Sequence, residues 1–215
     1  MKFLLGLLLA SVLCPVWGEG NPVDAHRLVG ERIQALMARI EALKNSVKVD
    51  EKARILAVEE VIGSAVDFKR MTRRVMAKYY KKSSKQQKND FHHAFKSTLL
   101  NTYAQGLWEF EDYKIRLKPL KNTRQSQRNT QVELEVVTAS GQVYSVIQSL
   151  FFHKKHQRWM IQNVIISGVN IGQLFRDQFA RLVAANQGDL DIAIKAWSLE
   201  LKAPSVIQIK EQEGA

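Results

Sequence analysis

The sequence has little of what most enzyme sites require. Its 215 residues include a single cysteine, Cys14, so the chain cannot be a disulfide scaffold. The patterns GxxxxGK[ST], GxGxxG, GxSxG and HExxH do not occur, so we find no phosphate-binding loop, dinucleotide fingerprint, nucleophile elbow or zinc-protease motif. We therefore expect a protein that does not itself hydrolyse ATP, has no cofactor and is not an enzyme.

Candidate metal ligands are few as well. Two histidines are adjacent on a predicted helix and two share a hairpin turn: His92, His93, His153 and His156. Neither pair has a third ligand or a carboxylate nearby in the sequence, so we expect solvated polar residues and no metal site.

Long hydrophobic runs are also lacking. The apolar run near the start, Phe3 to Leu13, is too short for a bilayer core, which needs about 20 apolar residues. Lys2 precedes this run. Val16 and Gly18 occupy positions −3 and −1 relative to a possible signal-peptidase cleavage site before Glu19, so residues 1–18 are predicted to be a cleaved secretory signal peptide. Cys14 raises the alternative of a lipoprotein, but Leu13 stands where a small residue normally precedes the lipidated cysteine.

Acidic residues are the minority: 32 Lys and Arg against 21 Asp and Glu give a net charge of +11. For an exported chain this excess favours anionic lipid headgroups or acidic proteins as partners over nucleic acid. The alternative is that the basic surface only keeps the protein soluble.

The most organised stretch runs from Ser84 to Tyr113. Ser84, followed three residues later by Gln87, is typical of a capping box at a helix start. Large apolar residues then recur at every fourth position: Phe91, Phe95, Leu99, Tyr103 and Leu107. Side chains four apart lie on one face of a helix, so this pattern predicts one long amphipathic helix of about 40 Å, against which a sheet can lie.

Shorter helices are predicted on both sides of this one. Asn21-Pro22 starts a helix that reaches Leu43, and Asp50 opens a second that ends near Gly63. A third begins at the capping pair Ser64 and Asp67 and continues through Tyr79 with a basic outer face. Residues 173–185 and 190–201 are the last two.

After Tyr113 the apolar period changes to two, which is typical of strands. The predicted strands are residues 114–118, 131–136, 142–152 and 159–166. The third has apolar residues on both faces, so the sheet is covered on both sides or curled around something. We therefore predict an α+β fold: a curved antiparallel four-stranded sheet with helices on its concave side, like a cone, forming one domain over residues 19–203, followed by a polar tail, 204–215.

Apolar surface is abundant on every element that would face the concavity. Each such residue could be plain core, but as a set they can leave a deep apolar pocket for lipid tails. The residues predicted to line it are Phe95, Leu99, Tyr103, Leu107, Val136, Ile147, Trp159, Ile161, Val164 and Phe175. A rival interpretation is a cone-fold enzyme that acts on a hydrophobic small molecule, but Glu133 and Glu135 are expected on the polar face and offer no catalytic acid. Another is a structural envelope protein with a solid core and no ligand.

Two sequence blocks resemble the MlaC family, also called the toluene-tolerance auxiliary family. The first contains four pairs that match the family pattern: Asp67-Phe68, Ser84 with Gln87, Phe91 with Phe95, and Leu99 with Tyr103-Ala104. The second contains Trp159, Ile161, Val164, Gly168-Val169 and the run Arg176-Asp177-Gln178-Phe179. Together the blocks extend over roughly residues 60 to 190. The sequence departs from the pattern at Asn163, where the family usually has Asp, at Asn170, where it often has Ser, and at Gly63-Ser64, where a proline is common.

The resemblance implies a soluble periplasmic phospholipid-binding protein with a nuclear-transport-factor-like sheet and extra helices around an apolar pocket. It implies a monomer that ferries lipid between an outer-membrane lipoprotein complex and the lipid-binding subunit of an inner-membrane ABC transporter, and so maintains outer-membrane lipid asymmetry. Independently of the family, charge points to a partner-docking face on the third helix and its end: Arg70, Arg73, Arg74, Lys78, Lys81 and Lys82. Its alternative is a merely solvated basic face.

Overall fold

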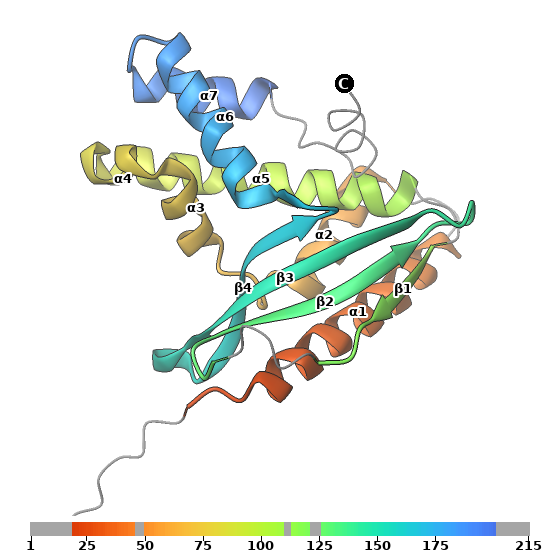
Figure 1. Ribbon diagram of the computed structural model, residues 1–215. Coiled ribbons are helices and arrows are strands. Elements are labelled where there is room, and N and C mark those ends of the chain that lie inside the picture. Colours follow the sequence, from red (N-terminus) through yellow and green to blue (C-terminus); the bar gives the residue numbers. More distant parts are fainter. Residues whose placement is uncertain (1–18, 46–49, 110–112, 121–125, 201–215) are drawn as a thin grey trace, which may run out of the picture.

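A computed structural model of the protein describes residues 19–45, 50–109, 113–120 and 126–200. Within these ranges the helices before the sheet are α1 (Pro22–Lys44), α2 (Glu51–Ile62), α3 (Phe68–Met76), α4 (Lys78–Lys82) and α5 (Lys85–Glu109). The strands are β1 (Lys114–Leu117), β2 (Asn129–Val137), β3 (Val143–His153), β4 (Arg158–Ile166) and β5 (Val169–Asn170), with a 3-10 turn at Lys154–His156. Helices α6 (Ile171–Ala185) and α7 (Leu190–Glu200) follow. This order confirms the predicted α+β class (Figure 1).

The sheet is antiparallel, and its strands lie side by side in sequence order. The four predicted strands are present, and the short β5 is a fifth. It exists because Ser167 and Gly168 both have positive φ, 48° and 93°, which is the conformation of a tight two-residue hairpin turn and folds the chain back along β4. A register shift between Ser149 and Leu150, where β3 pairs with β4, marks an irregularity of the kind that bends a strand.

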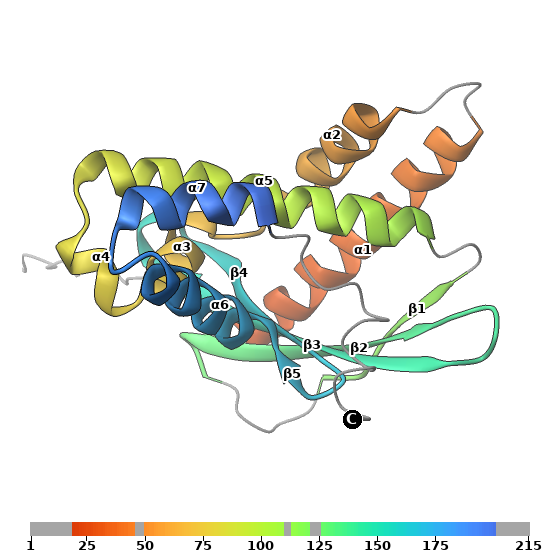
Figure 2. The same cartoon turned by 90° about the horizontal axis from the view of Figure 1, so that it is seen from above.

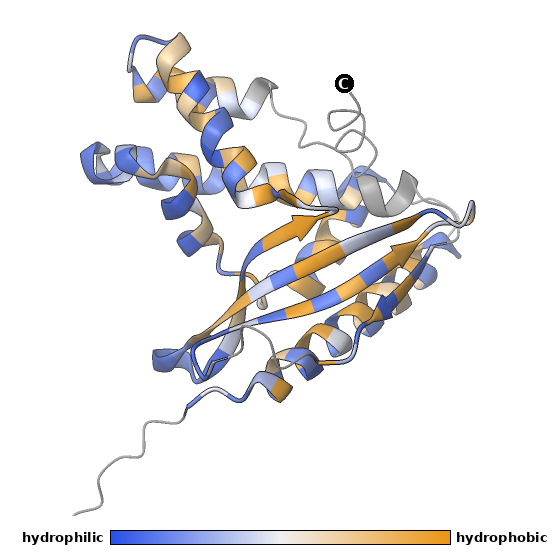
Figure 3. Cartoon of the chain, viewed as in Figure 1, coloured by the Kyte–Doolittle hydropathy of each residue, from blue (hydrophilic) through white to orange (hydrophobic). Residues whose placement is uncertain are grey.

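Each face of the sheet has a distinct composition, visible as alternating bands along β2 and β3 in Figure 3. On β2, Val132 and Leu134 are buried, while Glu133 and Glu135, which alternate with them, keep exposed surface. In Figure 2, α1, α2, α5 and α7 all lie on one side of the sheet. The buried side chains of β2 point to this helix-covered side, which we call the inner face.

Helix α1 covers the inner face directly. Asn21 caps it, because its side chain accepts a hydrogen bond from the Val23 N–H at 3.0 Å, and Pro22 occupies the first helical position as predicted. Ala25 and Val29 then pack in one apolar cluster with side chains of β2, β3 and β4. None of the helices in the described ranges is long and apolar enough to cross a membrane.

The third helix begins later than predicted. Asp67 is its N-cap and accepts from the Arg70 N–H at 2.9 Å, whereas Ser64 lies before the helix. The reason is tertiary: the Ile161 N–H donates to the Ala65 carbonyl at 2.7 Å, and the Asp67 N–H donates to the Ile161 carbonyl at 3.1 Å. These bonds hold the turn between α2 and α3 along β4 as extended backbone.

The same helix also ends earlier than predicted. Ala77, with φ of 45°, separates α3 from α4, although no glycine or proline marks the break. After the break Tyr79 packs edge-on against Phe179 of α6, with ring centroids 5.9 Å apart. The capping box of α5 is confirmed in both directions, because Ser84 and Gln87 each accept the other's backbone N–H at 3.0 Å.

Candidate functional site

Two apolar clusters make up the interior. The first apolar cluster is built from α2, α3, α5, α6, α7 and the end of β4, and its largest members are Phe91, Phe95, Phe175, Phe179 and Trp197. The second apolar cluster joins α1 and the α2–α3 turn to β2, β3 and β4, and includes Ala25, Val29, Val132, Leu150 and Trp159.

The centre of the first cluster is closed. Phe95 and Phe175 are 0% and 1% exposed, and their rings contact Trp197 at centroid distances of 5.9 and 5.8 Å. Side chains that line a space large enough for a ligand keep accessible surface, and these two keep almost none. They belong to a closed core.

Between the clusters lie three valines with a different exposure. Val66, Val146 and Val164 each pack against both clusters yet remain only half-buried. Val146 lies opposite Leu134 of β2, so it points to the inner face beneath the helices. We call these three residues the inner seam. Apolar side chains that pack against core on two sides and still keep accessible surface are candidates for the lining of a binding site.

Tyr103 of α5 is a further half-buried residue that packs against the first cluster. Burial raises the pKa of its phenol to about 12, yet the side chain is only half-buried by accessible area and packs against the first cluster. Among the described residues none forms a hydrogen bond with its hydroxyl. Tyr103 therefore places a phenol hydroxyl among apolar side chains without a described hydrogen-bond partner.

The remaining predicted lining residues separate into groups. Leu99, Trp159 and Ile161 are buried members of the two clusters. Val136 is half-buried on the inner face and packs against the second cluster. The side chain of Leu107 lies outside what the structure describes.

Ile147 requires a correction. It lies opposite Glu133 of β2, so it points away from the inner face to which Val136 and Val146 point. It belongs to neither cluster. β3 carries apolar residues on both faces, and alternation alone does not tell which set is inside. The register therefore removes Ile147 from the lining.

Sequence reasoning missed several half-buried apolar residues on this side of the molecule. They contact the clusters from α1, α2 and the strands: Leu36, Ile55, Ile62, Val66 and Val146. A signal was present in α1, where Ile33, Leu36, Met37 and Leu43 form an apolar stripe that exceeds what the helix buries, namely Ala25, Val29 and Ile40.

Five of the six cations predicted to form a docking face are exposed, and Arg70 is the exception. Arg70 is half-buried, its Nε donates to Gln162 Oε1 at 2.9 Å, and its guanidinium lies 4.0 Å from the centroid of Phe151, so it ties α3 to the sheet. The other five side chains are exposed: Arg73, Arg74, Lys78, Lys81 and Lys82. We call them the basic face.

Cations of the basic face lie over tyrosine rings. Arg73 is 5.8 Å from the Tyr80 centroid and Lys78 is 5.2 Å from the Tyr79 centroid. Partial burial, together with the charge of Arg70, lowers the pKa of Arg74. No described carboxylate forms an ion pair with these five cations, so their charge is available to an external partner.

The four histidines considered as metal ligands lie in two separate pairs. The rings of His153 and His156 are 4.4 Å apart at their centroids. His92 Nδ1 lies 3.1 Å from the Thr72 hydroxyl. Burial, followed by the charge of His93 and then of Lys69 and Lys96, lowers the pKa of His92. In the described part of the chain no three His, Cys, Asp or Glu side chains come together as metal ligands would.

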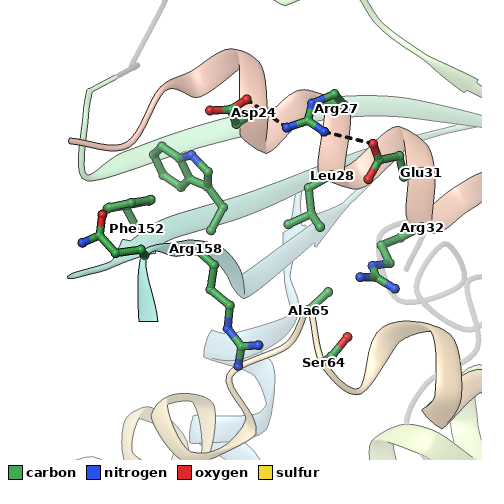
Figure 4. A pocket seen from close by; sticks show the side chains of 11 residues that line it. Asp24, Arg27, Leu28, Glu31, Arg32, Ser64, Ala65, Phe152 and Arg158 are labelled. Carbon is green, nitrogen blue, oxygen red and sulfur yellow. Dashed lines mark hydrogen bonds and ion pairs between the residues drawn. The ribbon is translucent and has the colours of Figure 1, made fainter. Parts of the chain in front are cut away.

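A polar pocket of about 340 Å³ opens beside the N-terminal half of α1 (Figure 4). We call it the α1 pocket. Its polar lining comes from α1, the α2–α3 turn and the end of the β3–β4 hairpin: Asp24, Arg27, Glu31, Arg32, Ser64, Gln157 and Arg158. Its apolar lining is Leu28, Ala65, Phe152 and Trp159, which all pack in or against the second cluster.

This architecture is shared with a solved structure. The phospholipid-binding protein from Ralstonia solanacearum, determined in complex with a phospholipid at 1.53 Å, superposes with a TM-score of 0.70 at 20% sequence identity. The similarity covers 81% of this chain and 94% of that one. The fold is therefore that of a known class of α+β proteins, a sheet covered by helices on its inner face.

Comparison of the sequence with known proteins identifies the family. Residues 31–198 match the family model described as MlaC protein, and the chain belongs to that family. It is also similar to the toluene tolerance protein ttg2D of Pseudomonas putida, with 31% identity over 199 residues, which covers 92% of this chain and 89% of that protein. The two blocks that carry the resemblance in the sequence lie within the matched range.

Proposed function

We propose that this protein binds phospholipid, with the acyl chains in the internal space that the inner seam faces. The observation that carries the proposal is the set of half-buried valines between two apolar clusters, with Tyr103 accessible in the interior. Support also comes from the solved structure of the same fold, which is a phospholipid-binding protein in complex with a phospholipid.

The physical chemistry of such a carrier favours retention of the lipid. Two acyl chains contain about 30 methylenes, and exposing them to water costs about 0.8 kcal/mol each, more than 20 kcal/mol in all. Spontaneous release into water is therefore negligible. Against a bilayer the interior only has to be about as apolar as the membrane, so transfer is close to balanced, and the direction must come from the partners.

We further propose that the protein carries lipid through the periplasm. The carrier would exchange lipid with an outer-membrane lipoprotein complex and with the lipid-binding subunit of an inner-membrane ABC transporter, and so maintain outer-membrane lipid asymmetry. A monomer suits this role because the protein has to dock on two different complexes in turn.

Export would remove residues 1–18, which lie outside the described part of the chain, as does the proposed tail at 204–215. We expect the mature protein to begin at Glu19, because Val16 and Gly18 fit the positions before a signal cleavage site. Intact-mass measurement of the exported protein checks this. A mass that includes residues 1–18, or a lipid on Cys14, would contradict it.

The basic face is proposed to speed docking on acidic partner surfaces or anionic headgroups. Reversal of three of its cations, Arg73, Arg74 and Lys78, to Glu should slow lipid delivery to acceptor partners about tenfold or more at low salt, because charge steering changes association rates by 10 to 1,000-fold. The difference should shrink as salt is raised, since the screening length falls to about 8 Å at physiological ionic strength.

The matched control reverses three exposed cations elsewhere, Lys114, Arg116 and Lys195, which gives the same net charge. Retained lipid is measured in both variants, so that loss of cargo is not mistaken for slow docking. Equal rates for the two variants and the wild type at low salt would show that the basic face is only solvated.

Phospholipid binding itself is tested by extracting the purified mature protein with organic solvent and analysing the extract by mass spectrometry. We expect phospholipid in near-stoichiometric amount. An extract without lipid, from protein that never contacted detergent, would instead support a structural protein with a solid core.

A further inference from the structure

Two arginines in the α1 pocket have no carboxylate partner. Arg32 projects from α1 and Arg158 from the start of β4, and Figure 4 shows their guanidinium groups on either side of Ser64 and Ala65. Neither forms an ion pair with any residue in the described ranges. Two cationic side chains therefore flank one turn, and neither has a carboxylate partner in the described part of the chain.

The carboxylates of the pocket are already engaged. Arg27 binds Asp24 at 3.1 Å and Glu31 at 3.2 Å, and the dashed lines in Figure 4 mark both contacts. This triad occupies the outer side of the pocket on one surface of α1. Arg27 thus neutralises one of its two carboxylates, and the three arginines and two acids of the lining leave the pocket with a net positive charge, in which Arg32 and Arg158 have no carboxylate partner.

The hydrogen bonds of Arg32 are incomplete. Its Nη1 makes one long contact, 3.4 Å, with the Val61 carbonyl, and its Nε is buried without a partner. Buried donors are nearly always paired in native proteins, and an unpaired one is costly. Nε itself is enclosed, but an anion in the pocket would supply a better acceptor than the Val61 carbonyl for the terminal N–H groups of the same guanidinium. The planar guanidinium fork matches the oxygens of phosphate in particular.

The apolar lining adds a preference for an anion that carries an organic group. Leu28, Phe152 and Trp159 form one side of the pocket and belong to or pack against the second cluster. Ala65 and Trp159 are 2% and 4% exposed, so this side of the pocket is continuous with the packed second cluster.

We propose that the α1 pocket is a second binding site, for a phosphate ester, in which Arg32 and Arg158 hold the phosphate over the α2–α3 turn and Ser64 offers a hydroxyl. The ester comes either from a small soluble molecule or from a lipid headgroup. The proposal stands independently of whether the interior carries acyl chains, since the two sites share no polar residue.

The test uses the mature chain and glycerol 3-phosphate as the probe, with inorganic phosphate alongside it, measured by titration calorimetry at low salt. Arg32→Gln and Arg158→Gln should each weaken glycerol 3-phosphate binding about tenfold or more, because each removes a charge-assisted hydrogen bond. Arg181→Gln is the control: Arg181 is exposed on α6, and its loss changes the net charge equally. Circular dichroism confirms that all three variants fold.

A second arm separates the sources of the ester by the phosphorus NMR signal of phospholipid bound to the protein. If the headgroup occupies the pocket, this signal shifts in Arg32→Gln and Arg158→Gln, and the loaded protein no longer binds glycerol 3-phosphate. If the ligand is soluble, the signal is unchanged and the loaded protein still binds the probe. The proposal is overturned if the wild type binds no probe and the signal is unchanged in the variants, or if Arg181→Gln weakens binding as much as they do.

Discussion

Val164→Asp is expected to yield a protein that carries little or no phospholipid. Val164 belongs to the inner seam and packs against both apolar clusters while remaining accessible. A carboxylate there would lie among the acyl chains without a hydrogen-bonding or charged partner. Burying it would cost several kcal/mol, and this cost would weaken lipid binding. We expect at least a tenfold fall in the lipid extracted per mole of protein, measured by mass spectrometry with an internal standard.

The next residue provides the control. Ile165 lies opposite Ile147 of β3, on the face away from the helices, and both are half-buried. Ile165→Asp introduces the same charge one position along the same strand, and lipid content should stay near that of the wild type. If both variants fold and lose lipid equally, or if neither loses any, the inner seam is not where the acyl chains lie.

Trp197→Ala should have the largest effect on stability. Trp197 is 0% exposed on α7 and its ring contacts Phe91 and Phe95 of α5 and Phe175 and Phe179 of α6. Removing so large a side chain from a closed cluster leaves a cavity, and such changes cost about 3–5 kcal/mol. Urea unfolding followed by circular dichroism measures the free energy of unfolding.

Ile192 is the matched control on the same helix. It is 50% exposed, so Ile192→Ala should change the free energy of unfolding by about 0.5 kcal/mol or less. Equal destabilisation by the two variants would mean that α7 is not anchored through Trp197. Because Trp197 belongs to the closed core of the first cluster, its loss should also weaken lipid retention, but only through the lower stability of the protein.

Much of the fold could be predicted because local signals and packing agree along the chain. The capping box at Ser84 correctly predicted where α5 starts. The four-residue spacing of Phe91, Phe95 and Leu99 correctly predicted which side of α5 is buried. Each of these local features has one physical interpretation, and it agrees with the packing. The strand alternation on β2 likewise placed Glu133 and Glu135 on the exposed face.

What could not be predicted depends on contacts far along the chain. The late start of α3 follows from hydrogen bonds between the α2–α3 turn and Ile161, more than 90 residues away by sequence. The position of Ile147 follows from the pairing of β3 with β2, which alternation on a two-faced strand leaves undetermined. The seam was missed for the same reason: half-burial is a property of the assembled clusters.

The two family departures at Asn163 and Asn170 prove to be in contact. Asn163 Nδ2 donates to Asn170 Oδ1 at 3.0 Å, and Asn163 Oδ1 accepts from the Gly172 N–H at 3.0 Å. Asn170 Oδ1 also accepts from the Gln173 N–H at the start of α6. An amide at 163 can donate to Asn170, which a carboxylate cannot do. The two asparagines therefore form one hydrogen-bonded pair at the start of α6, a contact that the separate positions in the sequence did not reveal.

The central claim is that acyl chains lie against the inner seam. The most direct measurement loads the mature protein with a phospholipid that carries a photoactivatable diazirine on an acyl chain, irradiates it, and maps the cross-linked residues by tandem mass spectrometry. Labels at Tyr103, Val146 or Val164, with none at Ile147 or Ile165, are the predicted result. Cross-links confined to the outer face of the sheet, or to the α1 pocket, would contradict the account.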